Sequence, residues 1–74
     1  MSENYYDEFM TKELALEIKE ARLGLKSGRS ATWRTVATII SVLHPKLDIC
    51  EGNQIEGMFL CESAIKFLKE DDWN

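Results

Sequence analysis

Apolar residues in the first third of the chain recur on two sides of one expected helix. At about 100° per residue, one side of residues 5–27 collects Tyr6, Met10, Leu14, Ile18, Ala21 and Leu25. The opposite side collects Tyr5, Phe9, Leu16 and Leu23. One side can face the chain's own core, so the other needs a partner. The pattern predicts a long, two-sided amphipathic first helix and favours a self-associating or target-binding protein, with the second set as the partner-binding residues.

The second segment, residues 31–43, is rich in β-branched residues that would suit a strand. Its polar residues nevertheless recur at intervals of three and four: Arg34, Thr35, Thr38 and Ser41. This spacing leaves the apolar residues on the other side of a helix: Trp33, Val36, Ala37, Ile39, Ile40 and Leu43. Ser30 can cap the N-terminus, and Pro45 disfavours helical backbone at His44. The segment is therefore predicted to be a helix.

A third helix is predicted over residues 54–70. Asp48 and Asn53 both offer N-caps with a glutamate three residues later, and Gly52 favours the later start. One side of this helix is apolar and partly small, which would permit another helix to approach closely: Gly57, Leu60, Cys61, Ala64, Phe67 and Leu68. Ile55 and Phe59 lie off that side, where they either extend the second apolar surface or cover the loop around residues 47–49.

The chain length limits how much stability one copy can have. Its 74 residues are expected to form one all-α, three-helix domain spanning residues 1–74. A core of that size rarely supplies more than about 3–5 kcal/mol. Association of copies would extend the core, so a homodimer or higher oligomer is expected.

The two cysteines and the hydropathy pattern favour an intracellular setting. The chain starts without a basic and apolar export leader, so Cys50 and Cys61 are expected to be free thiols in a reducing cytoplasm. No apolar run approaches the ~18 residues that a membrane span requires. We therefore expect a soluble cytoplasmic protein without a membrane partner.

The net charge of −4 is unevenly distributed. Between residues 19 and 34 five cationic side chains oppose one carboxylate, so this stretch carries +4 and the rest of the chain −8. A broad basic surface is absent, which makes duplex nucleic acid an unlikely partner. A helix-turn-helix motif is also disfavoured, because a loop containing Pro45 follows the second helix in place of a short turn.

The basic turn over residues 26–34 is the one stretch that suggests a ligand chemistry. Glycine and serine hydroxyls precede a helix start there, so amide hydrogens and cations would face the same space. The candidate anion-binding residues are Lys26, Arg29, Ser30 and Arg34. The spacing of glycines is not that of a phosphate-binding loop. A solvated turn with a good cap is the alternative interpretation.

Catalytic and metal chemistry have little support in the sequence. Cys50, Cys61 and His44 offer zinc-compatible atoms, but closely spaced ligand pairs are missing, and no nucleophile motif is present. We expect no enzyme activity, cofactor or metal. The first hypothesis is a non-catalytic helical interaction protein, acting stoichiometrically on itself or as an inhibitor or adaptor of a larger protein. The second is an oligomer that sequesters an anionic small molecule such as a nucleotide.

Overall fold

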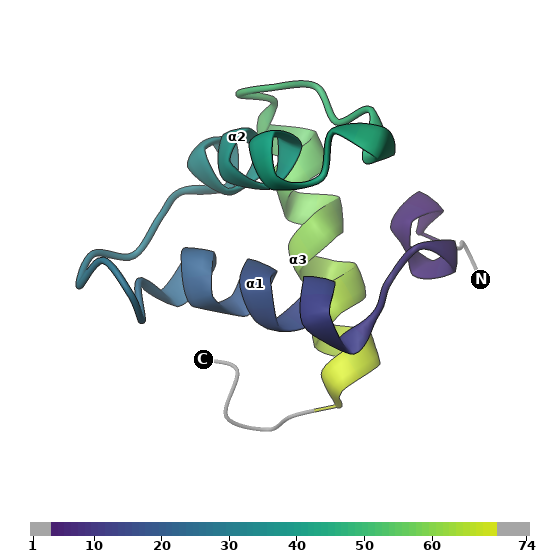
Figure 1. The fold of residues 1–74 in the computed structure, drawn as a ribbon, viewed down its shortest axis with the longest axis horizontal. Helices are drawn as coiled ribbons and strands as arrows, with labels where there is room; N and C mark the ends of the chain where they lie inside the picture. Colours follow the sequence, from purple (N-terminus) through teal and green to yellow (C-terminus); the bar gives the residue numbers. More distant parts are fainter. Residues whose placement is uncertain (1–3, 70–74) are drawn as a thin grey trace.

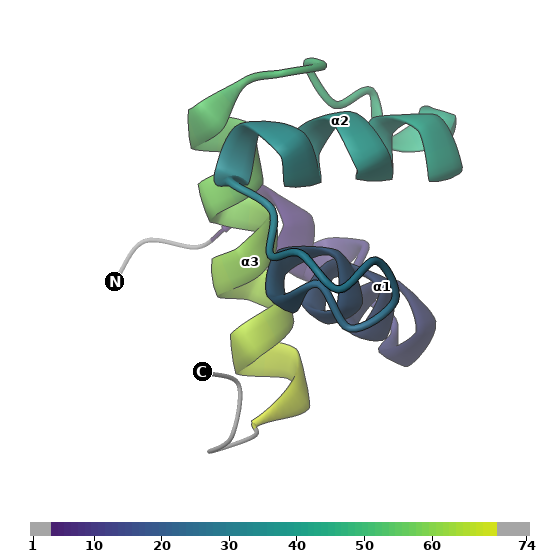
Figure 2. The same cartoon turned by 90° about the vertical axis from the view of Figure 1, so that its left-hand side faces the viewer.

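The chain folds into three α-helices and two short 3-10 helices, and α3 runs across α1 and α2 (Figure 1, Figure 2). This computed structural model describes residues 4–69. The α-helices are α1 (Lys12–Leu23), α2 (Trp33–Leu43) and α3 (Gln54–Leu68), and the 3-10 helices are η1 (Tyr5–Glu8) and η2 (Pro45–Leu47). No strand occurs among residues 4–69. The prediction of an all-α fold with three helices is confirmed.

The first helix is shorter than predicted, and its N-terminal part forms the separate element η1. Asn4 caps η1, because its side-chain oxygen accepts a hydrogen bond from the Tyr6 amide at 2.9 Å. Thr11 has extended backbone and caps α1, with its hydroxyl accepting a hydrogen bond from the Leu14 amide at 3.1 Å. Two N-cap residues therefore divide the segment. The prediction of one long helix over residues 5–27 is wrong.

The C-terminus of α1 also comes earlier than residue 27, where the predicted helix ends. Gly24 has left-handed backbone with φ of 71°, and its amide donates to the Glu20 carbonyl at 2.9 Å. A Cβ atom at Gly24 would lie 2.3 Å from the Arg29 carbonyl carbon. The chain folds back against Gly24, and only glycine satisfies both the backbone angle and this approach.

The second helix confirms the helical interpretation of a β-branched segment. Thr32 is its N-cap, and its hydroxyl accepts a hydrogen bond from the Thr35 amide at 3.3 Å. Ser30, the predicted cap, lies two residues earlier in the loop. The helix ends at Leu43, just ahead of Pro45, as predicted.

The third helix begins at the predicted cap and lies very close to α2. The Asn53 side-chain oxygen accepts hydrogen bonds from the Ile55 amide at 2.9 Å and the Glu56 amide at 3.2 Å. A Cβ atom at Gly57 would lie 1.9 Å from the Trp33 carbonyl oxygen. The predicted role of small residues on this helix is therefore confirmed at Gly57. The helix ends at Leu68 with Lys69 as its C-cap, and residue 70 of the predicted range lies outside the described residues.

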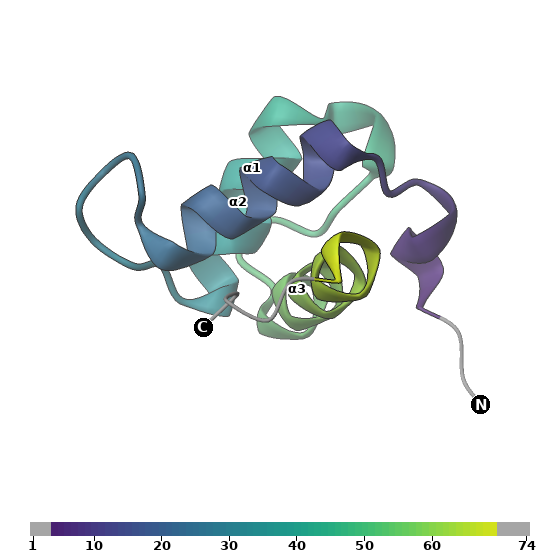
Figure 3. The ribbon, with the colours of Figure 1, turned by 90° about the horizontal axis from the view of Figure 1, so that it is seen from below.

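The core lies where α1 and α2 pack on α3, and η1 packs on another side of α3 (Figure 3). Its buried apolar residues are Tyr6, Met10, Leu14, Ala15, Ile18, Val36, Ala37, Ile40, Ile49, Leu60, Cys61 and Ala64. Most of the first predicted apolar set is thus buried, but Leu25 is 62% exposed because it follows the turn at Gly24. Within residues 4–69, no helix has the length and apolarity needed to cross a bilayer.

Candidate functional site

The N-terminal element η1 and its C-cap residue Phe9 display two aromatic rings on the surface. Tyr5 is 62% exposed and Phe9 is 41% exposed, and their ring centroids lie 5.1 Å apart with planes inclined at 51°. Between them in sequence, Tyr6 is only 2% exposed and belongs to the core. The short element therefore buries one aromatic ring as an anchor and presents two others as a pair, here called the aromatic pair.

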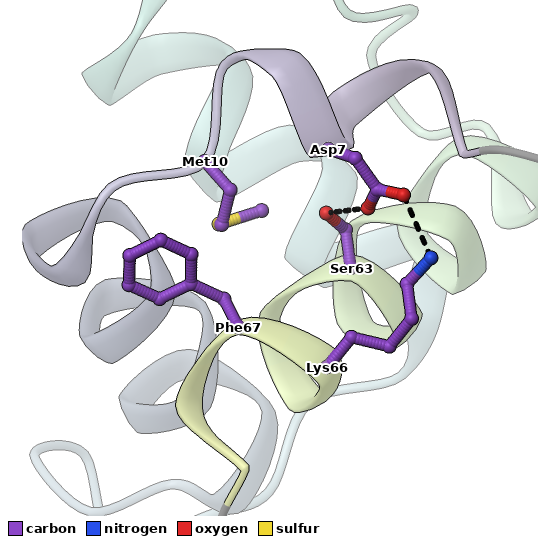
Figure 4. Close-up of a pocket in the computed structure, with 5 residues that line it drawn as sticks. All are labelled: Asp7, Met10, Ser63, Lys66 and Phe67. Atoms are coloured by element: carbon purple, nitrogen blue, oxygen red, sulfur yellow. Dashed lines mark hydrogen bonds and ion pairs between the residues drawn. The ribbon is translucent and has the colours of Figure 1, made fainter.

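Side-chain contacts to α3 hold η1 in place. The Asp7 carboxylate accepts a hydrogen bond from the Ser63 hydroxyl at 2.6 Å and pairs with the Lys66 ammonium at 2.7 Å (Figure 4). The Tyr6 hydroxyl donates to the Glu56 carboxylate. These contacts hold the backbone that carries the aromatic pair.

The pKa of Asp7 reflects this environment. Hydrogen bonds from Lys66 and then from Ser63 hold the pKa of the Asp7 carboxyl below its ordinary value of 3.8, against a small opposing effect of burial. The carboxylate is consequently ionised at neutral pH, which is the form that these two donors require.

A small cavity of about 200 Å³ lies beside these contacts. Met10 and Phe67 lie on one side of it, and the polar groups of Asp7, Ser63 and Lys66 lie on the other (Figure 4). Ser63 is 1% exposed, and its hydroxyl is satisfied by Asp7. The cavity therefore marks where η1 meets α3, and its polar groups are engaged with one another.

The structure brings together two of the four predicted partner-binding residues. Tyr5 and Phe9 belong to the N-terminal segment and touch each other, whereas Leu16 and Leu23 lie on α1 and are partly buried. The four residues do not form one helical side, because the helix that would align them is interrupted before Thr11. The aromatic pair is the exposed part of the predicted surface.

A groove of about 890 Å³ runs between α1, α2 and the loop that joins them. Three predicted anion-binding residues, Lys26, Arg29 and Ser30, line it, and Ala21 and Ile39 are among its apolar residues. Arg34 lies elsewhere, with its Nε donating to the Gly52 carbonyl at 3.4 Å. The structure therefore gathers three of the four candidates and separates the fourth.

Carboxylates offset the positive charge in this groove. The Lys26 ammonium lies 3.3 Å from the Glu20 carboxylate, and Glu17 contacts the His44 ring. Both glutamates line the groove. Within residues 4–69, no carboxylate pairs with Arg29, which leaves its guanidinium as the cation available to an anionic ligand.

The two cysteines occupy different environments. Cys61 is buried in the core, and burial raises the pKa of its thiol to about 11. Cys50 is exposed, and both are free thiols. The His44 ring contacts the Glu17 carboxylate. Among residues 4–69 no group of three or more His, Cys, Asp or Glu side chains is arranged to hold a metal ion.

Sequence reasoning missed the surface of α3 on which η1 docks. The polar side chains of Glu56 and Lys66 on this surface contact Tyr6 and Asp7. The available signal was the second N-cap residue, Thr11, which permits residues 5–8 to leave the helix axis. Ile55 and Phe59 were noted as lying off the packed side of α3, and both are exposed.

Comparison of the chain with protein-family models, with curated proteins and with solved structures finds no match.

Proposed function

We propose that this chain is a small non-catalytic interaction protein that acts stoichiometrically through the aromatic pair. The partner is a second copy of the chain or a larger protein for which it serves as inhibitor or adaptor. The observation that carries the proposal is the exposure of Tyr5 and Phe9 on an element whose intervening residue, Tyr6, is buried. Aromatic side chains of this kind supply a large share of the binding energy at protein interfaces.

The anchoring of η1 supports this function. A binding surface that is already ordered loses little conformational freedom on association, so more of its contact energy appears as affinity. Tyr6 in the core and Asp7 on α3 provide that order. An exposed aromatic pair on a mobile terminus would lack this advantage.

Self-association can be tested with the purified chain alone. Sedimentation velocity of the wild type and of a Tyr5→Ser, Phe9→Ser double variant compares the oligomer with and without the pair. Loss of a contact worth 2 kcal/mol at an interface centre raises the dissociation constant about 30-fold. The matched control is Val42→Ser, which removes an apolar side chain that is 68% exposed on α2. If the control and the double variant change the dissociation constant equally, the proposal is contradicted.

A second candidate function is capture of a small anion in the groove between α1 and α2. The observation that favours it is the presence of Lys26, Arg29 and Ser30 along one groove. A nucleotide that fills this site at 100 times its dissociation constant would stabilise the fold by about 2.7 kcal/mol. Thermal unfolding with inorganic phosphate and with nucleoside mono-, di- and triphosphates measures this effect. Arg29→Ala should abolish it, and the absence of any shift would eliminate this candidate.

A further inference from the structure

The contacts between η1 and α3 follow one side of the longer helix. Asn4 donates from its side-chain amide to the Phe59 carbonyl at 2.6 Å, and the Tyr6 hydroxyl donates to Glu56. Asp7 contacts Ser63 and Lys66. The α3 positions 56, 59, 63 and 66 are separated by three, four and three residues, which places them on one side of a helix. The four-residue η1 is thus fastened along more than two turns of α3.

Among these contacts, Asp7 forms the ion pair with α3. One carboxylate oxygen, Oδ1, accepts the Ser63 hydroxyl, and the other, Oδ2, accepts the Lys66 ammonium. Hydrogen bonds with an ionised partner are stronger than neutral ones. Ser63 is buried, so loss of the Asp7 acceptor would leave its hydroxyl without this partner. One residue therefore joins the element that carries the aromatic pair to both a buried and an exposed group of α3.

Helix formation within η1 cannot replace these contacts. A four-residue 3-10 helix contains few internal hydrogen bonds, and isolated helical turns are unstable in water. In η1 the Asp7 amide donates to the Asn4 carbonyl and the Phe9 amide donates to the Tyr6 carbonyl. The backbone after Phe9 is extended at Thr11, which separates η1 from α1. The place of η1 on α3 therefore depends on its side-chain contacts and on the burial of Tyr6.

We propose that Asp7 is a positioning residue, a latch whose contacts with Ser63 and Lys66 hold the aromatic pair in its binding geometry. This inference rests on the proposed function, since it explains how the surface formed by Tyr5 and Phe9 is kept ordered. When the latch is open, Tyr5 and Phe9 remain on the chain but lose their fixed relation to α3. Association then weakens although no residue of the binding surface has changed.

Asp7→Asn tests the latch, and Glu8→Gln is its matched control. Both substitutions remove one negative charge from η1, but Glu8 forms no side-chain hydrogen bond or ion pair within residues 4–69. Backbone NMR signals of Tyr6 and Phe9 report the state of η1. Asp7→Asn should shift these signals, increase the exchange of both amide hydrogens severalfold and weaken association severalfold. Glu8→Gln should leave all three readouts at wild-type values.

A pH titration assigns the effect to the Asp7 carboxyl. The ionisable groups of α3 that contact η1 are Glu56 and Lys66, while Glu8 and the two tyrosines belong to η1 itself. The wild-type η1 signals should move toward those of Asp7→Asn as the pH falls below about 3.8, the ordinary pKa of an aspartate. The η1 signals of Asp7→Asn should not show this pH-dependent change. A wild-type profile that persists in Asp7→Asn would overturn the assignment.

Substitutions of Lys66 provide a second test at a partly exposed position that does not threaten folding. Lys66→Gln should release η1, and Lys66→Arg should retain the wild-type signals because the cation is kept. Unchanged η1 signals in both Asp7→Asn and Lys66→Gln would overturn the latch. If the NMR signals show that η1 is released but the dissociation constant is unchanged, the positioning role of Asp7 is overturned. A monomeric wild type would contradict self-association instead, and the NMR measurements would still test the latch.

Discussion

At the scale of single residues, Gly57 permits a close approach between α2 and α3. The hydrogen at this position faces the Trp33 carbonyl, and a Cβ atom would lie 1.9 Å from the carbonyl oxygen. Real Cβ contacts are never this short, so any larger residue must push α2 and α3 apart. The identity of one side chain therefore sets how the two helices meet.

Gly57→Ala should lower the free energy of unfolding by roughly 1–3 kcal/mol through overpacking. This loss should be seen even though alanine favours a helix over glycine by about 1 kcal/mol. Urea denaturation followed by circular dichroism measures the change. Glu62→Ala is the control, because it introduces alanine at an exposed position of the same helix. If Gly57→Ala has the same free energy of unfolding as the wild type, the helices are not in close contact at this position.

The two thiols should differ in reactivity. Burial raises the pKa of the Cys61 thiol to about 11, so little thiolate forms there at pH 8. Cys50 is exposed. Iodoacetamide at pH 8 should therefore modify Cys50 and spare Cys61 in the folded chain, and modify both in denaturant. Mass spectrometry of the alkylated peptides distinguishes these outcomes, and equal labelling in the native state would contradict burial of Cys61.

At the scale of elements, N-cap residues determine where the helices begin. Asn53 accepts hydrogen bonds from two backbone amides at the start of α3. Asn53→Ala removes this acceptor and should destabilise the protein by about 1 kcal/mol. Asn53→Asp retains an oxygen at the same place and should stay close to the wild type. Thermal unfolding of the three proteins measures the effect, and a stable Asn53→Ala would show that the cap contributes little.

The element boundaries also show which structure could be predicted from the sequence. Pro45 and Asn53 each act through their own backbone or nearest neighbours, and the boundaries predicted from them are correct. The division at Thr11 was not predicted, because the periodicity of the apolar residues continues through it and outweighed the N-cap signal of Thr11. Tyr6 and Met10 are buried as that periodicity required, but from η1 and the segment that follows it.

The candidate surface was only partly predictable for the same reason. Tyr5 and Phe9 could be recognised as apolar residues left over from the core. Their contact with each other depends on the turn of η1, and η1 depends on Asp7 meeting Ser63, 56 residues away in the chain. Such a distant polar contact leaves no periodic pattern. The position of Arg34 outside the groove likewise follows from packing of α2 near Gly52.

At the scale of the whole molecule, a small core and an ordered exposed aromatic pair favour association. The chain has 74 residues, and several large apolar side chains remain on its surface in addition to Tyr5 and Phe9: Leu25, Val42, Leu43, Ile55, Phe59, Ile65 and Phe67. Burial of such side chains against a second copy adds apolar contact area that one copy cannot provide. The aromatic pair is the part of this surface that the contacts of Asp7 with α3 hold in place.

The most direct test of this account is the solution mass of the wild-type chain, measured by light scattering after size exclusion over a wide range of concentrations. The account predicts a mass of at least twice the 8.5 kDa of one chain, with dissociation at the lowest concentrations. A mass of 8.5 kDa at every concentration would contradict self-association through the aromatic pair.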